Sequence, residues 1–407
     1  MRAWGFARGY FGRMKPPIVV FLVGALVASA ALAAPAYDLH EWGTFTTVAG
    51  SDGVLLDGLE REEEGLPAFV HSHDGMSGSG KGLNRPLSGV TVKMETPVIY
   101  FYTDEAFRAQ LTVGFAGGAI SQWYPQRSGG EVVPPLEFDR ATGKVTSGAI
   151  DFHKPYAGKI QWDVEVLPRA AVDPVKLFKP MFETLTWVRP KMAAAAVVRT
   201  GKEYEDFLFY RGVGRLELPL VTRVDDRGVL QLNNRGGDPV PFALVFESDL
   251  TGGVRYAVLR DGIKPAATTA VAPADFRKPA EDWVEEVFKE MRAGLTGAGL
   301  TAAEAEGMLA TWWQSYFGKP GLRIFWILPA AEVDRILPLD VAPAPRTRVR
   351  VIVGRSEVLR PEFEAQLVTA FTGTGEAAEA AKWMFQNDRF GLAYAARVAA
   401  LTATADR

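Results

Sequence analysis

The chain has 407 residues, with 45 basic and 48 acidic side chains, four histidines and no cysteine. The lack of cysteine excludes a disulfide framework, a zinc site built on thiolates and a catalytic thiol. Without the four basic residues of the leader described next, the net charge is about −7, which argues against a nucleic acid or an anionic membrane surface as partner.

Residues 1–33 have the pattern of a secretory signal peptide. A short basic opening precedes an uncharged, mostly apolar run that ends at Ala31-Leu32-Ala33, a small-x-small cleavage signal. The cut falls after Ala33 or after Ala36, and translation starts at Met1 or at Met14. The alternative is an uncleaved membrane anchor, but the apolar run is shorter than the roughly 20 residues that a spanning helix needs. We therefore expect a secreted or periplasmic protein with no stable membrane span after cleavage.

From residue 40 to about residue 271, short apolar runs are separated by Gly, Pro, Asn and Asp, which is typical of antiparallel β-sandwiches. The run over residues 160–166 alternates with a period of two, so its even-numbered side chains are predicted to share one buried face. Gly117-Gly118 separates two strand-like runs and predicts a hairpin over residues 111–124. We assign residues 34–190 to a β-sandwich domain.

Residues 191–272 are predicted to form a second β unit. Four apolar runs are joined by turn sequences at residues 225–228, 235–238 and 251–253, which predicts a meander. Residues 232–242 resemble the strand–turn–strand of many bacterial immunoglobulin-like modules.

The pattern changes after Pro273, and residues 273–407 are predicted to form an α+β unit that is mainly helical. Apolar residues at helical spacing follow one another between residues 284 and 295. Thr301 and Glu304 form a capping box at the start of the next helix. The predicted fold class is therefore mainly β, with antiparallel β-sandwich regions followed by a mainly helical α+β part.

The four histidines lie in the first part of the mature chain. In an extended backbone His71 and His73 face the same side and could bind one ion, with His40 or His153 as a third ligand. Zinc or copper held in this way would activate a water molecule for hydrolysis. The alternative is that His71 and His73 are solvated histidines at the edge of a loop.

Two further patterns favour loops. Residues 75–81 have the spacing of a phosphate-binding loop, but Gly82 stands where a Ser or Thr must hold magnesium, so we predict a flexible loop. The acidic run of residues 60–64 lacks the regular spacing of a calcium loop and is predicted to be solvated.

Residues 40–46, with the sequence His-Glu-Trp-Gly-Thr-Phe-Thr, are predicted to form the first strand, with Trp42 in the core. Together with residues 93–102, 209–212 and 353–355, this opening resembles a family of exported bacterial proteins of unknown function. The resemblance implies export, and it brings neither an activity nor an assigned site.

The predicted function is that of an exported binding or scaffold protein that acts on a cell-envelope protein or glycan. This prediction depends on the export signal, the β-rich pattern and the lack of a specific catalytic motif in the sequence. The alternative is a metal-dependent hydrolase with a site centred on His71 and His73.

Overall fold

The computed structural model describes residues 1, 4–5, 34–63, 65–73, 83, 85–179, 185–279 and 282–405. The chain divides into two units, Met1–Ala34 and Pro35–Arg407, and the helices and strands described below belong to the second. Most of the expected signal peptide and the glycine-rich loop over residues 75–82 lie outside the described residues. In the described part of the chain, no helix is both long and apolar enough to span a bilayer.

A nine-stranded sheet forms the centre of the second unit. Its strands, in spatial order, are β18 (Val254–Leu259), β17 (Ala243–Ser248), β20 (Gly321–Ile327), β22 (Thr347–Val358), β1 (Asp38–Ala49), β4 (Val92–Tyr102), β14 (Leu208–Gly214), β6 (Gly118–Tyr124) and β2 (His71–Ser72). Neighbours run antiparallel except β1 and β22, which are parallel. Strands from all three predicted domains thus pair in one sheet, which crosses both expected boundaries.

Smaller sheets complete the β structure. A six-stranded sheet contains β13 (Glu203–Glu205), β12 (Val197–Thr200), β11 (Ala157–Leu167), β5 (Phe107–Ala116), β21 (Leu339–Ala342) and β7 (Gly129–Gly130). A three-stranded sheet contains β15 (Leu220–Val224), β16 (Leu230–Asn234) and β19 (Ala267–Val271). Two short pairs join β3 (Leu87–Ser88) to β10 (Ile150–Asp151) and β8 (Glu137–Phe138) to β9 (Val145–Ser147).

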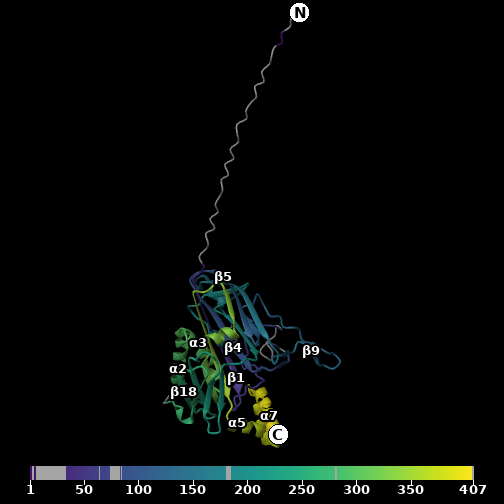
Figure 1. Cartoon of the computed structure of the whole chain (residues 1–407), viewed down its shortest axis with the longest axis vertical. Coiled ribbons are helices and arrows are strands. Elements are labelled where there is room, and N and C mark those ends of the chain that lie inside the picture. The colour runs from purple at the N-terminus through teal and green to yellow at the C-terminus, as the bar shows by residue number, and fades with distance from the viewer. Residues whose placement is uncertain are drawn as a thin grey trace. The chain divides into compact units, whose positions relative to one another are not determined.

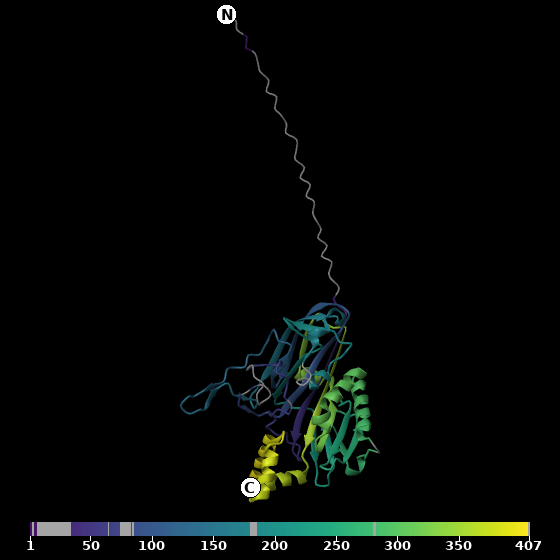
Figure 2. The same ribbon diagram turned by 180° about the vertical axis from the view of Figure 1, so that it is seen from behind.

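Six helices follow in the C-terminal part, after the short α1 (Leu185–Val188). They are α2 (Trp283–Gly297), α3 (Ala302–Trp312), α4 (Ala330–Ile336), α5 (Pro361–Thr372), α6 (Glu376–Gln386) and α7 (Gly391–Ala405), and a π-helical turn, η5 (Trp313–Phe317), continues α3. Figures 1 and 2 show α2 and α3 alongside the strands of the large sheet, and α5 and α7 near the C-terminus. The mainly β fold with a helical C-terminal part is as predicted.

The large sheet is covered on both faces. Leu39 and Phe45 of β1 pack in a core shared with β5 and β11, whereas Trp42 packs in a second core shared with α2 and α3. The predicted alternation of residues 160–166 is confirmed, because Ile160, Trp162, Val164 and Val166 are all buried. Both faces of β1 are therefore buried, and Trp42 lies in the core as expected.

The predicted hairpin over residues 111–124 is wrong. β5 pairs with β11 and β21, whereas β6 pairs with β14 and β2 in the other sheet. Gly117, with φ +92°, carries the chain from one sheet to the other at a point where a Cβ would lie 2.5 Å from the carbonyl oxygen of Arg215. The glycines are needed because the chain passes close to other backbone where it moves from one sheet to the other. In the sequence, this requirement cannot be distinguished from that of a turn.

The predicted meander is correct in its two hairpins and wrong in how they connect. β15 pairs with β16, and β17 pairs with β18. The second edge of β16 is taken by β19, so β17 crosses into the nine-stranded sheet and pairs with β20. Residues 232–242, which resemble the hairpin of an immunoglobulin-like module, therefore join strands of two different sheets.

Candidate functional site

The four segments that carry the family resemblance lie on neighbouring strands. Residues 40–46 belong to β1, 93–102 to β4, 209–212 to β14 and 353–355 to β22, and the sheet order here is β22-β1-β4-β14. Segments from opposite ends of the sequence thus lie side by side in the centre of one sheet.

Both pairings of β4 are irregular at this place. The register shifts between Trp42 and Thr44 where β1 meets β4, and between Phe209 and Gly212 where β14 meets β4. Such bulges change the direction in which side chains point, and they are frequent next to functional sites.

The backbone is strained beside the bulge. Gly43 is required because a Cβ there would lie 2.7 Å from the Cα of Pro97. Thr96 has φ +48°, a left-handed conformation that costs a residue with a Cβ about 1–2 kcal/mol. Strain of this kind persists where the surrounding structure holds it, and it gathers at functional sites.

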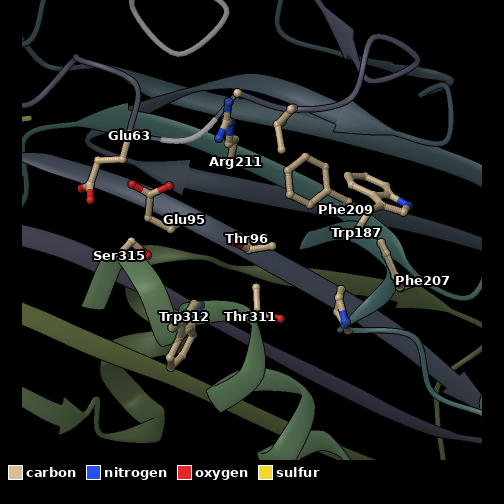
Figure 3. Close-up of a pocket in the computed structure, with 13 residues that line it drawn as sticks. Glu63, Glu95, Thr96, Trp187, Phe207, Phe209, Arg211, Thr311, Trp312 and Ser315 are labelled. Atoms are coloured by element: carbon tan, nitrogen blue, oxygen red, sulfur yellow. The ribbon is translucent and has the colours of Figure 1, made fainter. Parts of the chain in front are cut away.

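A cavity of about 60 Å³ lies over this part of the sheet (Figure 3). Its walls come from the 63–66 segment, β4, β14, α1, α3 and η5. They are formed by Glu63, Gly65, Leu66, Glu95, Thr96, Trp187, Pro190, Phe207, Phe209, Arg211, Thr311, Trp312 and Ser315. Figure 3 shows the carboxylates of Glu63 and Glu95 at one end, the aromatic rings of Trp187, Phe207 and Phe209 at the other, and Arg211 between them.

The helical wall of the cavity is held in place by polar contacts. The predicted capping box is confirmed at the start of α3, where Thr301 and Glu304 bond to each other's backbone amides. At the other end, the hydroxyl of Tyr316 lies 2.7 Å from that of Thr44 on β1. The π-helical turn between these anchors places Ser315 at the cavity, and such turns are frequent at functional sites.

Glu63 is the centre of a buried ion network. It is paired with Lys93, which is fully buried, and its Oε2 lies 3.0 Å from Arg389 and 3.4 Å from Arg355. Burial by itself would raise the pKa of Glu63, but the three cations, Lys93 first, hold it well below its usual range. The ionised form of Glu63 is therefore favoured. Lys93 also lies 3.7 Å from Glu95.

Glu357 extends the network toward β20. Its carboxylate accepts hydrogen bonds from Arg355 at 2.6 Å and from Arg389 at 3.1 Å, and lies 3.3 Å from Arg323. Burial opposes ionisation of Glu357, but the arginines, Arg323 first, lower its pKa. Burial also lowers the pKa of Arg323 to about 10. Burying charged groups is costly unless each is paired. Each charged group of this network contacts a group of opposite charge.

Arg211 presents part of its guanidinium to the cavity. Its Nε donates to Gln122 at 2.6 Å and its Nη2 is bonded to Glu62. The side chain is only 4% exposed, and among the described residues nothing accepts a hydrogen bond from Nη1.

The aromatic end is fixed by a buried carboxylate. Trp187 donates its Nε1–H to Glu205 at 2.7 Å, and Glu205 also accepts from Lys191 at 2.5 Å. Trp187 packs against Phe207 and Phe209, with ring centroids 5.3 and 4.9 Å away. This wall is apolar and closely packed.

A cleft of about 1270 Å³ shares Glu63 and Ser315 with the cavity. It lies between η5, the turn after β17, the start of β20, the end of β22 and the C-terminal helices. Its rim carries apolar side chains that remain open to solvent, with Leu250 92% and Met384 57% exposed. The two spaces adjoin at Glu63 and Ser315, and the cleft is lined by apolar side chains together with many charged ones. Concave sites with polar groups that converge are the usual places of ligand binding.

The four predicted histidines each have a different acidic partner. His40 Nδ1 lies 3.0 Å from Glu304, and His71 Nε2 lies 2.7 Å from Glu203. His73 Nε2 lies 2.7 Å from the carbonyl oxygen of Ile120 and 3.6 Å from Glu131, and His153 Nδ1 lies 2.9 Å from Asp151. Among the described residues no group of three or more His, Asp or Glu is arranged to hold a metal ion.

Two residues of the acidic run, Glu62 and Glu63, are held in ion pairs, whereas the run is predicted to be solvated. Glu63 is 8% exposed and Glu62 is paired with Arg211, because cations from β4, β14, β22 and the turn before α7 converge on them. In the sequence, the site is indicated by the set of four segments. The charge pattern of one strand does not reveal which charged side chains the neighbouring strands contribute.

Comparison with known proteins yields no family assignment. No family model matches the chain, and no curated protein matches it. Among solved structures, the Fcho1 Mu homology domain of Danio rerio with a bound Eps15 peptide aligns over 81% of this chain and 100% of that chain. The sequence identity is 7% and the TM-score is 0.30, a level that does not indicate a shared fold.

Proposed function

We propose that this protein is an exported binding protein of the cell envelope, and that the cavity and the adjoining cleft form its recognition site. The observation that carries the proposal is the meeting of four segments on adjacent, bulged strands, where ionised and aromatic side chains line one space. The export signal expected for residues 1–33 supports the location, and an envelope protein or glycan is the expected partner.

Two polar groups of the cavity are poorly placed for catalysis as a general acid or as a serine nucleophile. A general acid must release a proton near neutral pH, whereas Glu63 is held as an anion by three cations. A serine nucleophile needs a base within hydrogen-bond reach, and among the described residues the hydroxyl of Ser315 has no hydrogen-bond partner. The groups present can orient a ligand, which is what a recognition site requires.

Site-specific photo-crosslinking tests this function. Benzoylphenylalanine is placed at Met384 or at Leu250, both of which line the cleft, in the full chain expressed in its own cells. We expect both variants to capture the same partner. Trp383 is the matched control, because it lies on the same helix and is 69% exposed but does not line the cleft. Equal capture at Trp383, or none at Met384 and Leu250, would refute the proposal.

A further inference from the structure

The chain is acidic overall, but its charge is unevenly distributed. Residues 169–202 contain seven basic and two acidic side chains, so this segment carries a net charge of +5. Three of the basic side chains are ion-paired, with Glu165, Glu205 and Asp206. The other four have no carboxylate partner among the described residues. They are Lys176, Lys179, Arg189 and Lys202.

Exposed apolar side chains lie in the same segment. Val175 belongs to the short η2 (Pro174–Leu177) and Phe178 follows it, and Phe178 is 75% exposed. Each of these two residues is followed in the sequence by a lysine. Val188, at the end of α1, is also exposed. Apolar side chains that gather on a surface mark interaction sites.

The two sides of this surface share one aromatic base, although residues 180–184 between them lie outside the described part of the chain. Nζ of Lys179 lies 5.0 Å from the ring centre of Phe69 and 4.8 Å from that of Tyr124. The ring of Trp187 lies 5.2 and 5.7 Å from the same two rings. The exposed residues next to Lys179 and Trp187 in the chain therefore belong to one part of the surface. We call it the η2–α1 patch, and it consists of Val175, Lys176, Phe178, Lys179 and Val188.

The base of the patch is fixed. Lys179 donates a hydrogen bond to the hydroxyl of Tyr124 at 2.8 Å, and Trp187 is bonded to Glu205. Trp187 also lines the aromatic end of the cavity (Figure 3). Groups that are already held in place lose little conformational entropy when they bind a partner.

The composition of the patch fits the surface of a bilayer. Apolar side chains enter the boundary between head groups and acyl chains, while lysines remain at the level of the phosphates. Unpaired positive charge favours lipids with anionic head groups. None of the five patch residues lines the cavity or the cleft, and a bilayer surface needs no concave site.

We propose that the η2–α1 patch docks the mature protein on a bilayer surface that contains anionic phospholipids, with Val175 and Phe178 among the acyl chains and Lys176 at the phosphates. This inference goes beyond the proposed recognition site. The net charge of the whole chain disfavours such a partner, but charges more than about 10 Å from the membrane are largely screened at 0.1 M salt. The local charge of the patch therefore decides.

Flotation with lipid vesicles tests the proposal. The chain from residue 35 onward contains the described helices and strands and lacks the apolar run of the expected signal peptide, which would itself bind lipid. We expect at least about tenfold stronger binding to phosphatidylethanolamine with about 30% phosphatidylglycerol than to phosphatidylcholine alone. Raising the salt from about 0.1 M to about 1 M shortens the Debye length from about 10 Å to about 3 Å and should remove most of this difference.

Variants locate the contact. Phe178→Ser and Lys176→Glu should each weaken binding to the anionic vesicles at least about fivefold. The hairpin of β8 and β9 is the matched control, because Phe138 is 54% exposed, Lys144 is exposed, and neither belongs to the patch. Phe138→Ser and Lys144→Glu make the same chemical changes and should leave binding unchanged. All four side chains are exposed, so these variants should fold as the parent does.

A fluorescent probe reports insertion directly. The chain has no cysteine, so Phe178→Cys or Phe138→Cys provides a single attachment point for nitrobenzoxadiazole. Anionic vesicles should shift the emission to the blue at position 178 and leave it unchanged at position 138, because only position 178 moves from water into an apolar environment.

The proposal is overturned if the chain does not float with anionic vesicles, if it binds phosphatidylcholine equally, or if the hairpin variants weaken binding as much as the patch variants. Binding of a polyglutamate peptide, with no blue shift at position 178 on vesicles, would assign the patch to an acidic protein and overturn the lipid proposal. Crosslinking at Met384 and Leu250 reports on the cleft, so failure of the recognition site is distinguishable from failure of this proposal.

Discussion

Replacement of Glu63 by glutamine probes the ion network that lies beneath the cavity. Lys93 is fully buried and Glu63 is 8% exposed, so solvent screens their interaction little. The substitution keeps the size of the side chain but removes the carboxylate in direct contact with Lys93, leaving Glu95 3.7 Å away. Removing one partner of a buried ion pair typically costs about 3–5 kcal/mol, and we expect a loss in this range.

Urea unfolding at pH 7, followed by tryptophan fluorescence, measures this loss, provided that the slope with denaturant is unchanged. Glu332→Gln is the matched control, since Glu332 pairs with Arg335 on the surface of α4 and should cost no more than about 1 kcal/mol.

The double variant Glu63→Gln/Lys93→Met isolates the pair. An apolar side chain at position 93 removes the buried charge that Glu63→Gln leaves uncompensated. The double variant should therefore be less destabilised than the sum of the single variants by at least about 1 kcal/mol. The reasoning is refuted if the two effects simply add, or if Glu63→Gln costs no more than Glu332→Gln.

Two further predictions follow from the titratable groups. Glu63 and Glu357 have lower pKa values in the folded chain than in the unfolded chain, so their stabilisation is complete above the unfolded value of about 4.3 and is lost as the pH falls below it. The urea concentration at the midpoint of unfolding should therefore decrease as the pH is lowered below about 4.5. This decrease should be less steep in Glu357→Gln, and an equally steep decrease in both proteins would contradict the assignment. The histidine hypothesis predicts about one equivalent of zinc or copper in the mature protein purified without added metal, and loss of that metal in His71→Ala/His73→Ala. Because Nε2 of His71 and Nε2 of His73 are each hydrogen-bonded to an oxygen, a metal would be bound through Nδ1. Isolation of the protein free of metal would refute the histidine hypothesis.

Patterns that depend on one element were predictable. The alternation in residues 160–166 predicts a buried face because the side chains of a strand alternate, whatever the strand pairs with. Thr301 and Glu304 predict the start of α3 because a capping box is closed by groups within one turn. Neither inference needs knowledge of the rest of the chain.

Pairing between distant elements was not predictable. Gly117-Gly118 has the composition of a turn, but the glycines allow close passage between two sheets. The turn over residues 235–238 connects strands of different sheets, because β19 pairs with the edge of β16 that β17 would need. In both places the local chemistry is correctly read, and the wrong partner is inferred.

The candidate site shows the same division. Four segments were recognised in the sequence, yet their residues look unrelated until β22, β1, β4 and β14 lie side by side. Glu304 illustrates how a predicted residue gains further contacts, since its carboxylate also accepts a hydrogen bond from Tyr102 at 2.8 Å and lies 3.0 Å from His40.

The sequence by itself determined the β-rich class, the buried faces of individual strands and the helix starts, because these depend on periodicity and on contacts within a few residues. Only the tertiary structure decided that Glu63, Lys93, Arg355 and Arg389 meet. Their contacts join four separate segments, and bulges in two strand pairings determine which side chains face the cavity. A bulge changes the face on which every later side chain of a strand lies, and nothing in the local sequence specifies where the neighbouring strand will impose one.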